Sequence, residues 1–473
     1  MKKRTERSFI LTVILAVICS FTVVLSGCIF NKKEPAPVYV TSIEKTASNE
    51  EMDVYTVYYS DGTTSVLQIK NGKDGKDADA VTVNDLYNEY VNRYGDITYA
   101  EFLQIYFSFE QSEYSVVNSC LRSTAKVYSE FKERVTSSTQ ETNIYTGSAV
   151  IYKMDSDYTY FITNYHVVYD SAAIGSKISE KIYVYMYGSE SYPVESGKNS
   201  NGSIVYDYGD YAIACDYIGG SVNYDIALIK AKTSDVQSIS PSACAIEYAT
   251  DYVVGETAIA IGNPNDAGVS VTQGIVSVDN EFIPLDIDGT MRTYRSIRID
   301  TPLYHGNSGG GLFNTDGKLI GITNAGNESE QNINYAIPVQ IVSRAVDNIL
   351  YYYNDGNSLT NGLYKITLGV TVQAQNSRFE YDAKLGYGKI VEDITVLEVA
   401  ENSITEKLKL AANDVITAII IDGEKISLNR YFEIGDCLLE IRENTVINIE
   451  YVREGKTHTT SNYIVKNSDL QLA

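Results

Sequence analysis

The sequence predicts a mainly β protein in which two antiparallel β-barrels precede a small α+β domain. Residues 115–350 are short β-rich runs separated by glycine and asparagine, a pattern typical of paired antiparallel barrels. Apolar residues then recur at helical spacing over 341–352, and a polar stretch at 354–357 marks a boundary. At 473 residues the chain is too long for one ordinary domain, so the region after residue 357 is expected to fold separately.

The first residues have the features of a secretory signal peptide, predicted to span residues 1–27. Three basic residues at 2–4 precede an uncharged apolar run at 9–25, and LSGC follows at 25–28. LSGC resembles a bacterial lipobox, which implies cleavage before Cys28 and lipid attachment to its sulfur. The alternative is an uncleaved transmembrane anchor, because the apolar run approaches spanning length. Either interpretation places the rest of the chain at the cell membrane, facing outside the cytoplasm.

Two segments of different character are expected between the signal peptide and the barrels. Residues 28–80 are predicted to be a tether with a β-hairpin, because residues 52–70 alternate apolar and polar around Asp61-Gly62. Residues 81–112 are predicted to be a helical spacer, since several apolar side chains there fall on one helical face. The sequence assigns no chemical role to either segment.

Composition excludes several classes of partner and cofactor. The formal net charge is -23, and such acidity disfavours nucleic acid and anionic lipid as partners. Cys120, Cys215, Cys244 and Cys437 are widely spaced, with no C-x-x-C pair, which argues against a zinc site and a dense disulfide framework. Buried free thiols are the favoured interpretation, and the sequence does not choose a disulfide pair. No metal or organic cofactor is expected.

The most informative segment is YHGNSGGGLF at 304–313, in which glycines flank Ser308 on both sides. A serine hydroxyl is a poor nucleophile unless a base lies beside it. His166 ends one apolar run and Asp225 begins another. The chain order His, Asp, Ser is that of chymotrypsin-like proteases. His166 is therefore the predicted base, Asp225 the group that orients it, and Ser308 the nucleophile.

The same segment predicts an oxyanion-binding loop. Glycines let the backbone turn sharply and direct N–H groups at a developing negative charge. The predicted loop consists of Gly306, Asn307 and Ser308, with the backbone N–H groups of Gly306 and Ser308 as donors.

Together these segments resemble the HtrA/DegP family, which are trypsin-fold serine proteases with PDZ domains. Further segments that resemble the family lie in the correct order at 146–151, 258–264, 270–277, 317–322 and 335–338. The resemblance implies a trypsin-like protease domain at 113–352 and a PDZ-like domain at 358–467. Such a domain binds an extended peptide as an added strand and captures its carboxylate with backbone N–H groups. By resemblance, the carboxylate loop is formed by Thr367, Leu368, Gly369 and Val370.

A rival interpretation comes from the pattern G-x-S-x-G at 306–310, which also fits the nucleophile elbow of α/β-hydrolases. That elbow needs a helix after the serine and a catalytic histidine downstream. Here an Asp316-Gly317 turn follows, which favours a hairpin, and His458 is the only histidine downstream. The rival is therefore disfavoured.

Three positions depart from the family pattern. His305 and Gly311 stand where the family usually has proline, and both substitutions would loosen the oxyanion loop. Pro302 stands six residues before Ser308, where trypsin-like enzymes place an acid for basic side chains. Cleavage after Lys or Arg is therefore not expected.

The resulting expectation is a lipid-anchored serine endopeptidase of HtrA type that acts on unfolded or damaged envelope proteins. Its PDZ-like domain would capture exposed C-termini, and by resemblance it would form a homotrimer. The alternative is a surface-anchored peptide-binding protein or chaperone with a dormant protease site.

Overall fold

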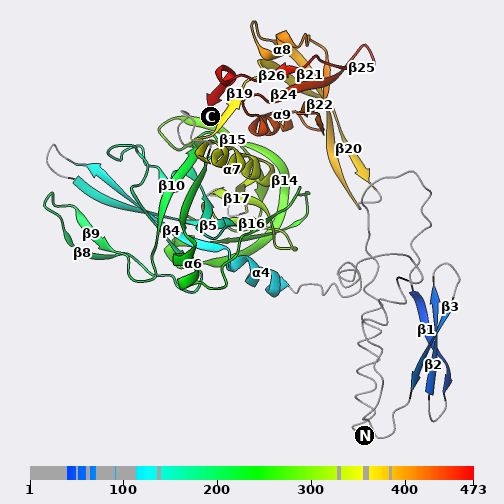
Figure 1. The fold of residues 1–473 in the computed structure, drawn as a ribbon, viewed down its shortest axis with the longest axis horizontal. Coiled ribbons are helices and arrows are strands. Elements are labelled where there is room, and N and C mark those ends of the chain that lie inside the picture. The colour runs from blue at the N-terminus through cyan, green and yellow to red at the C-terminus, as the bar shows by residue number, and fades with distance from the viewer. Residues whose placement is uncertain are drawn as a thin grey trace. The chain divides into compact units, whose positions relative to one another are not determined.

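The computed structural model describes most of the chain from residue 113 onward and three strands before it (Figure 1). The described residues are 40–48, 52–59, 64–70, 91, 113–135, 140–326, 332–354, 362–382 and 386–473. The predicted signal peptide, Cys28 and nearly all of the predicted spacer at 81–112 lie outside them. The chain divides into two compact units, residues 1–110 with 381–388 and residues 111–380 with 389–473.

The first unit contains a three-stranded antiparallel sheet of β1 (Val40–Ser48), β2 (Met52–Tyr59) and β3 (Thr64–Lys70). Strands β2 and β3 pair antiparallel with Met52 opposite Lys70, and the predicted turn at Asp61-Gly62 lies outside the described residues. Strand β1 adds to the free side of β2, which the sequence did not predict.

The second unit begins with a closed six-stranded antiparallel barrel, in the order β10, β11, β6, β5, β4, β7. Its strands are β4 (Thr124–Arg134), β5 (Gln140–Met154), β6 (Tyr158–Thr163), β7 (Lys181–Met186), β10 (Ile213–Ser221) and β11 (Ile226–Lys232). Val127, Ile151 and Ile229 are fully buried in its core. Two short helices, α5 (Tyr165–Val168) and α6 (Thr233–Ile239), follow β6 and β11.

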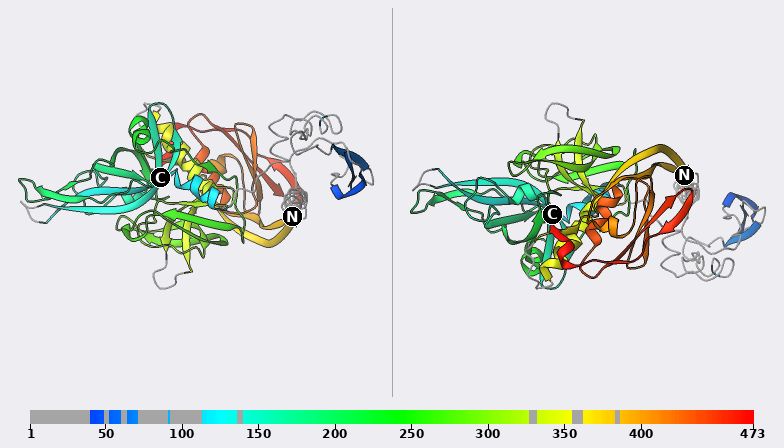
Figure 2. Two further views of the ribbon diagram at one scale, coloured as in Figure 1. Left: turned by 90° about the horizontal axis from the view of Figure 1, so that it is seen from below. Right: turned by 90° about the horizontal axis from the view of Figure 1, so that it is seen from above.

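A hairpin of β8 (Val194–Lys198) and β9 (Ile204–Asp207) lies beside the far ends of β4 and β5, as Figures 1 and 2 show. The Thr142 hydroxyl donates to the Ile204 carbonyl at 3.0 Å, and the Ser203 hydroxyl donates to the Gln140 carbonyl at 3.0 Å. These bonds fix the hairpin to the barrel's long ribbon.

A second sheet of seven strands follows, in the order β12, β17, β16, β13, β14, β15, β18. An additional pairing between β17 and β18 closes six of these strands on themselves, so the prediction of two antiparallel barrels is confirmed. The strands are β12 (Glu247–Tyr248), β13 (Thr257–Gly262), β14 (Ser270–Asp286), β15 (Met291–Ile299), β16 (Gly311–Phe313), β17 (Lys318–Gly326) and β18 (Asn334–Pro338).

Two helices pack on the barrels. Helix α7 (Val339–Asn354) contains the helix predicted at 341–352, and its apolar face, including Val342, Val346 and Ile349, is fully buried. These side chains share one core cluster with residues of both barrels and with Val116 of α4 (Glu113–Leu121). The two barrels are thus joined by a continuous apolar core.

The C-terminal region has its own core and a mixed arrangement of strands and short helices. Its sheet runs in the order β20, β21, β22, β24, β25, with β23 beside β22 and β26 beside β24. The strands are β20 (Val370–Asp382), β21 (Tyr387–Val399), β22 (Val415–Ile421), β23 (Glu424–Ser427), β24 (Val446–Arg453), β25 (Lys456–Thr459) and β26 (Tyr463–Ile464). The helices are α8 (Ile404–Lys407) and α9 (Glu433–Cys437), and a separate pair joins β19 (Tyr364–Ile366) to β27 (Leu470–Leu472).

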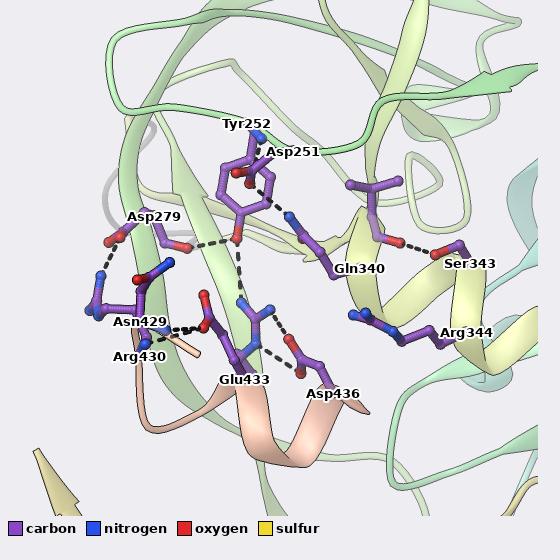
Figure 3. Close-up of polar contacts among 12 residues, drawn as sticks. Asp251, Tyr252, Asp279, Gln340, Ser343, Arg344, Asn429, Arg430, Glu433 and Asp436 are labelled. Carbon is purple, nitrogen blue, oxygen red and sulfur yellow. Dashed lines mark hydrogen bonds and ion pairs between the residues drawn. The ribbon is translucent and has the colours of Figure 1, made fainter. Parts of the chain in front are cut away.

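Ion pairs attach this region to the second barrel, as the close-up in Figure 3 shows. Asp436 of α9 pairs with Arg295 of β15, and both side chains are almost fully buried. Arg430 pairs with Asp279 of β14 and donates from Nε to Glu392 at 3.0 Å. Because these charges are desolvated and mutually neutralised, breaking one pair would leave a buried charge without its partner.

Within the described ranges, no helix is both long and apolar enough to cross a bilayer. Cys120 and Cys437 are buried free thiols, whereas Cys215 and Cys244 are half-buried and free. The expectation of buried thiols therefore holds fully for two of the four cysteines.

Candidate active site

The predicted base and its orienting carboxylate come together on the first barrel. His166 lies in α5, directly after β6, and Asp225 lies in the turn between β10 and β11. Nδ1 of His166 is 3.0 and 2.9 Å from the two carboxylate oxygens of Asp225. The His166 backbone N–H donates to the same carboxylate at 3.1 Å. A carboxylate accepts hydrogen bonds, so Nδ1 carries the proton and Nε2 is left as the basic nitrogen.

The backbone holds Asp225 in place. Its side chain is fully buried, its φ is +53°, and its carbonyl accepts a hydrogen bond from Asn164 Nδ2 at 2.8 Å. An aspartate tolerates this left-handed conformation better than most residues do. The turn therefore directs the carboxylate back toward α5.

Burial and charge act in opposite directions on His166. Burial lowers the pKa of the imidazole, but the charge and hydrogen bonds of Asp225 outweigh burial and raise the pKa above its ordinary value of 6.5. The pair is therefore suited to accept a proton near neutral pH.

The Ser308 loop of the second barrel lies against the His166 turn. The Ser308 carbonyl accepts from the Ser148 N–H of β5 at 2.8 Å. Gly309 has φ +85°, and a Cβ there would be 2.5 Å from Thr163 Oγ1 and 3.1 Å from the Asn164 nitrogen. Only glycine permits this approach.

The last bond of the predicted triad is not formed. Among the described residues, the Ser308 hydroxyl makes no hydrogen bond to His166. Such bonds are often loose without substrate and tighten in the reacting complex. The structure thus brings His166 and Asp225 into contact and places the Ser308 loop beside them.

The peptide group before Gly306 has a fixed orientation. The His305 carbonyl accepts from the Asn265 N–H at 2.6 Å, and the Gly306 carbonyl accepts from the Ser148 hydroxyl at 2.8 Å. In a trans peptide the C=O and N–H groups point in opposite directions, so the Gly306 N–H points away from Asn265. Among the described residues, neither this N–H nor that of Ser308 donates a hydrogen bond, so both can serve as oxyanion donors.

Asn307 differs from its two neighbours. Its N–H donates to the Tyr304 carbonyl at 3.0 Å and its carbonyl accepts from the Gly310 N–H at 2.8 Å. These bonds close the turn, so Asn307 shapes the predicted oxyanion loop but contributes no donor to it. This role agrees with the predicted assignment of Gly306 and Ser308, and not Asn307, as the donors.

The two departures at 305 and 311 have structural explanations. His305 is exposed, and its carbonyl is the group that Asn265 holds. Gly311 begins β16 and pairs with Ile322 and Ile261, and a Cβ at this glycine would collide with the Phe313 ring. The hydrogen bond to the His305 carbonyl and the strand pairing of Gly311 hold the loop on both sides. They argue against the expectation that these two residues loosen it.

The predicted carboxylate loop of the C-terminal region also has a defined geometry. The Leu368 carbonyl accepts from the Thr405 N–H and hydroxyl at 3.1 and 3.0 Å, and the Gly369 carbonyl accepts from the Ala400 N–H at 2.8 Å. The N–H groups of Gly369 and Val370 therefore point the opposite way. Thr367 is exposed and Leu368 is buried. Strand β20, which begins at Val370, is the edge of its sheet, where an extended peptide can pair.

One group near the site was not predicted from the sequence. Asp266 belongs to the 263–268 loop, whose Asn265 N–H holds the His305 carbonyl, and it forms an ion pair with Lys126 of β4. The one available signal was a lysine between the apolar Ala125 and Val127. Within the described ranges, no group of three or more His, Cys, Asp or Glu side chains is arranged to hold a metal ion.

Comparison with known sequences places this site in context. A sequence-family model described as a trypsin-like peptidase domain matches residues 146–322, which contain His166, Asp225 and Ser308. A serine protease HtrA-like protein of Staphylococcus aureus strain MRSA252 is 30% identical over 290 residues, covering 59% of this chain and 32% of the relative. A protein of the same description from Staphylococcus epidermidis is 29% identical over 296 residues, covering 61% and 44%. The chain thus spans less than half the length of these relatives.

The similar solved structures are covered over nearly their whole length. The HtrA-type protease AlgW with a tripeptide has 22% identity and a TM-score of 0.47, covering 76% of this chain and 98% of that one. The serine endoprotease from Yersinia pestis has 22% identity and a TM-score of 0.40, covering 75% and 97%.

Proposed function

We propose that this chain is a serine endopeptidase of HtrA type. The observation that carries the proposal is the buried Asp225 carboxylate on Nδ1 of His166, at 2.9 Å, beside the Ser308 loop. Similarity to serine protease HtrA-like proteins over 59% of the chain supports it. This arrangement fits acyl transfer better than any other reaction, because it supplies a base, a nucleophile and free N–H donors together.

The reaction follows from these roles. Ser308 Oγ attacks the peptide carbonyl carbon while His166 Nε2 takes its proton, and Asp225 stabilises the imidazolium. The negative charge that develops on the carbonyl oxygen is bound by the N–H groups of Gly306 and Ser308. Collapse of this intermediate breaks the C–N bond, and His166 returns the proton to the leaving amine. Water then repeats the sequence and releases the acyl group from Ser308.

The substrates in this proposal are unfolded or damaged envelope proteins. The free edge of β20 and the outward N–H groups of Gly369 and Val370 support capture of an exposed C-terminus by a PDZ-like region. Attachment to the outer face of the membrane through Cys28, and assembly as a homotrimer, belong to the same proposal. Replacing Cys28 by serine should abolish incorporation of a fatty-acid label, because the lipid would be attached to the Cys28 sulfur.

A fluorophosphonate probe on the full chain tests the central claim. Wild type should be labelled, whereas Ser308→Ala should lose labelling and lose peptidase activity by on the order of 10⁶-fold. Ser200→Ala, an exposed serine on the β8–β9 turn, is the matched control and should label as wild type does. An apolar peptide with a free C-terminus, added in a parallel reaction, should increase the labelling rate.

The outcome that contradicts the proposal is equally clear. If wild type is not labelled with or without unfolded protein and peptide, the protein does not hydrolyse peptides by this route. The alternative, a peptide-binding protein with a dormant site, would then be favoured.

A further inference from the structure

A fully buried lysine pairs with the 263–268 loop, which contacts the oxyanion loop. Lys126 of β4 has no exposed side-chain surface, and its Nζ is 2.7 Å from Asp266 Oδ1. The ammonium also lies 4.0 Å from the ring centre of Tyr192 and 4.8 Å from that of Tyr128. A buried ammonium is costly unless it is paired, so Asp266 is the group that makes this position of Lys126 tolerable.

Three other side chains converge on the same carboxylate. Tyr128 donates its hydroxyl to both oxygens of Asp266, at 2.7 and 2.8 Å. Thr146 donates to Oδ1 at 3.2 Å, and Asn263 Nδ2 lies 3.3 Å from it. Burial and the bond to Asp266 both raise the pKa of Tyr128, so the phenol stays protonated and remains a donor. The carboxylate is thus held from several directions, although a third of its side chain is exposed.

This network determines the shape of the 263–268 loop. Asn265 and Asp266 both have left-handed backbone conformations, with φ of +51° and +57°, which non-glycine residues adopt at a cost. The Asn263 side chain accepts from the Gly268 N–H at 3.0 Å and closes the loop. The strained pair persists because the contacts of Asp266 and Asn263 hold it.

The loop in turn holds the peptide that precedes Gly306. The Asn265 N–H, adjacent to Asp266, donates to the His305 carbonyl at 2.6 Å. If this bond is lost, the His305–Gly306 peptide can rotate and direct its carbonyl, instead of its N–H, toward the reacting oxygen. A carbonyl there would repel the oxyanion, where an N–H would stabilise it.

We propose that Asp266, with Lys126 and Tyr128, is a positioning residue that sets the direction of the Gly306 N–H. The inference rests on the proposed serine endopeptidase function and extends it to a group that does not touch the substrate. Asp266 acts through Asn265 and His305. Its loss should therefore reduce the stabilisation of the transition state and leave the affinity for substrate unchanged.

Strand β4, which carries Lys126, also carries a residue that provides a matched control. Glu130 of β4 is also a carboxylate paired with a lysine and a tyrosine, because Lys181 Nζ lies 2.9 Å away and the Tyr208 hydroxyl donates to it at 3.1 Å. Its hydrogen-bond and ion-pair partners are outside the 304–310 loop. Glu130→Gln therefore removes an equivalent charge on the strand that carries Lys126 without reaching the proposed oxyanion donors.

The test compares Asp266→Asn with Glu130→Gln in the full chain. For Asp266→Asn, kcat on a peptide substrate should fall on the order of 10²-fold, as for loss of one oxyanion donor, with KM nearly unchanged. Affinity for a peptide aldehyde, whose adduct with Ser308 carries an oxyanion, should fall by a similar factor. Glu130→Gln should lower thermal stability and leave both quantities at the wild-type values per folded molecule.

Several results would overturn the inference. One is an Asp266→Asn protein with wild-type kcat. Another is a fall in kcat that Glu130→Gln reproduces, or that a smaller folded fraction of Asp266→Asn accounts for. A third is a raised KM with unchanged kcat. If Asp266→Asn does not fold, Tyr128→Phe removes one donor from the network and should lower kcat in the same direction by a smaller factor. An inactive wild type, in contrast, refutes the proposed function itself, which the probe experiment detects separately.

Discussion

The two barrels contribute to the candidate site in different ways. The first barrel supplies side chains, His166 and Asp225, whose mutual contact is direct and whose chemistry belongs to the residue types. The second barrel supplies Ser308 together with backbone N–H groups, whose usefulness depends on which way a peptide points. That direction is fixed by Ser148 of the first barrel and by Asn265. Side-chain roles are therefore local, whereas the backbone donors depend on contacts from distant segments.

Apart from removal of Ser308, the largest loss of activity should come from breaking the pair of His166 and Asp225 on the first barrel. Asp225→Asn places an amide where Nδ1 needs an acceptor, which favours the wrong imidazole tautomer. We expect kcat to fall by about 10⁴-fold, measured on a peptide substrate. Asp216→Asn, an exposed carboxylate on β10, should have no such effect, and equal losses in the two variants would remove Asp225 from the mechanism.

A smaller effect, on stability, should come from replacing Ser148, the serine that links the two barrels. Ser148 Oγ donates to the Gly306 carbonyl and accepts from the Asn263 N–H, both at 2.8 Å. Ser148→Ala leaves two buried polar groups unpaired, at about 1–3 kcal/mol in the free energy of unfolding, measured by denaturant titration.

Ser129→Ala provides the comparison for that measurement. Ser129 is equally buried, but its hydroxyl has no hydrogen-bond partner among the described residues. Its removal should leave stability unchanged or raise it slightly. A similar destabilisation in both variants would show that Ser148 acts by volume alone.

The smallest effect concerns the dependence of activity on pH. His166 must be neutral to accept a proton, and its pKa lies above 6.5, so activity should fall about tenfold per pH unit below that raised pKa. The same raised pKa means that the pair stabilises the fold fully below the unfolded pKa, and that this contribution is lost as pH rises through the folded one.

Nuclear magnetic resonance can measure this pKa directly. The chain has three histidines, so the His166 ring can be followed in Ser308→Ala. Adding Asp225→Asn removes the charge that raises the pKa and leaves burial, which lowers it. The midpoint should therefore move to lower pH, and an unmoved midpoint would show that Asp225 does not control His166.

Much of the architecture could be predicted from local patterns. Short β-rich runs predicted two antiparallel barrels, and helical spacing predicted the helix at 341–352, both of which the structure contains. Strand β1 and the ion pairs at α9 were not predicted, because pairing partners and buried charges depend on residues far apart in the chain.

The sequence by itself determined which residue types are present and in what order: a serine among glycines, a histidine and an aspartate at the ends of apolar runs. Those features specify chemistry because nucleophilicity and basicity belong to side chains. Only the tertiary structure decided that the Asn307 N–H donates to Tyr304, that the Gly306 N–H has no acceptor among the described residues, and that Asp266 pairs with Lys126. The physical reason is that a peptide dipole takes its direction from hydrogen bonds to distant segments, and local sequence does not encode them.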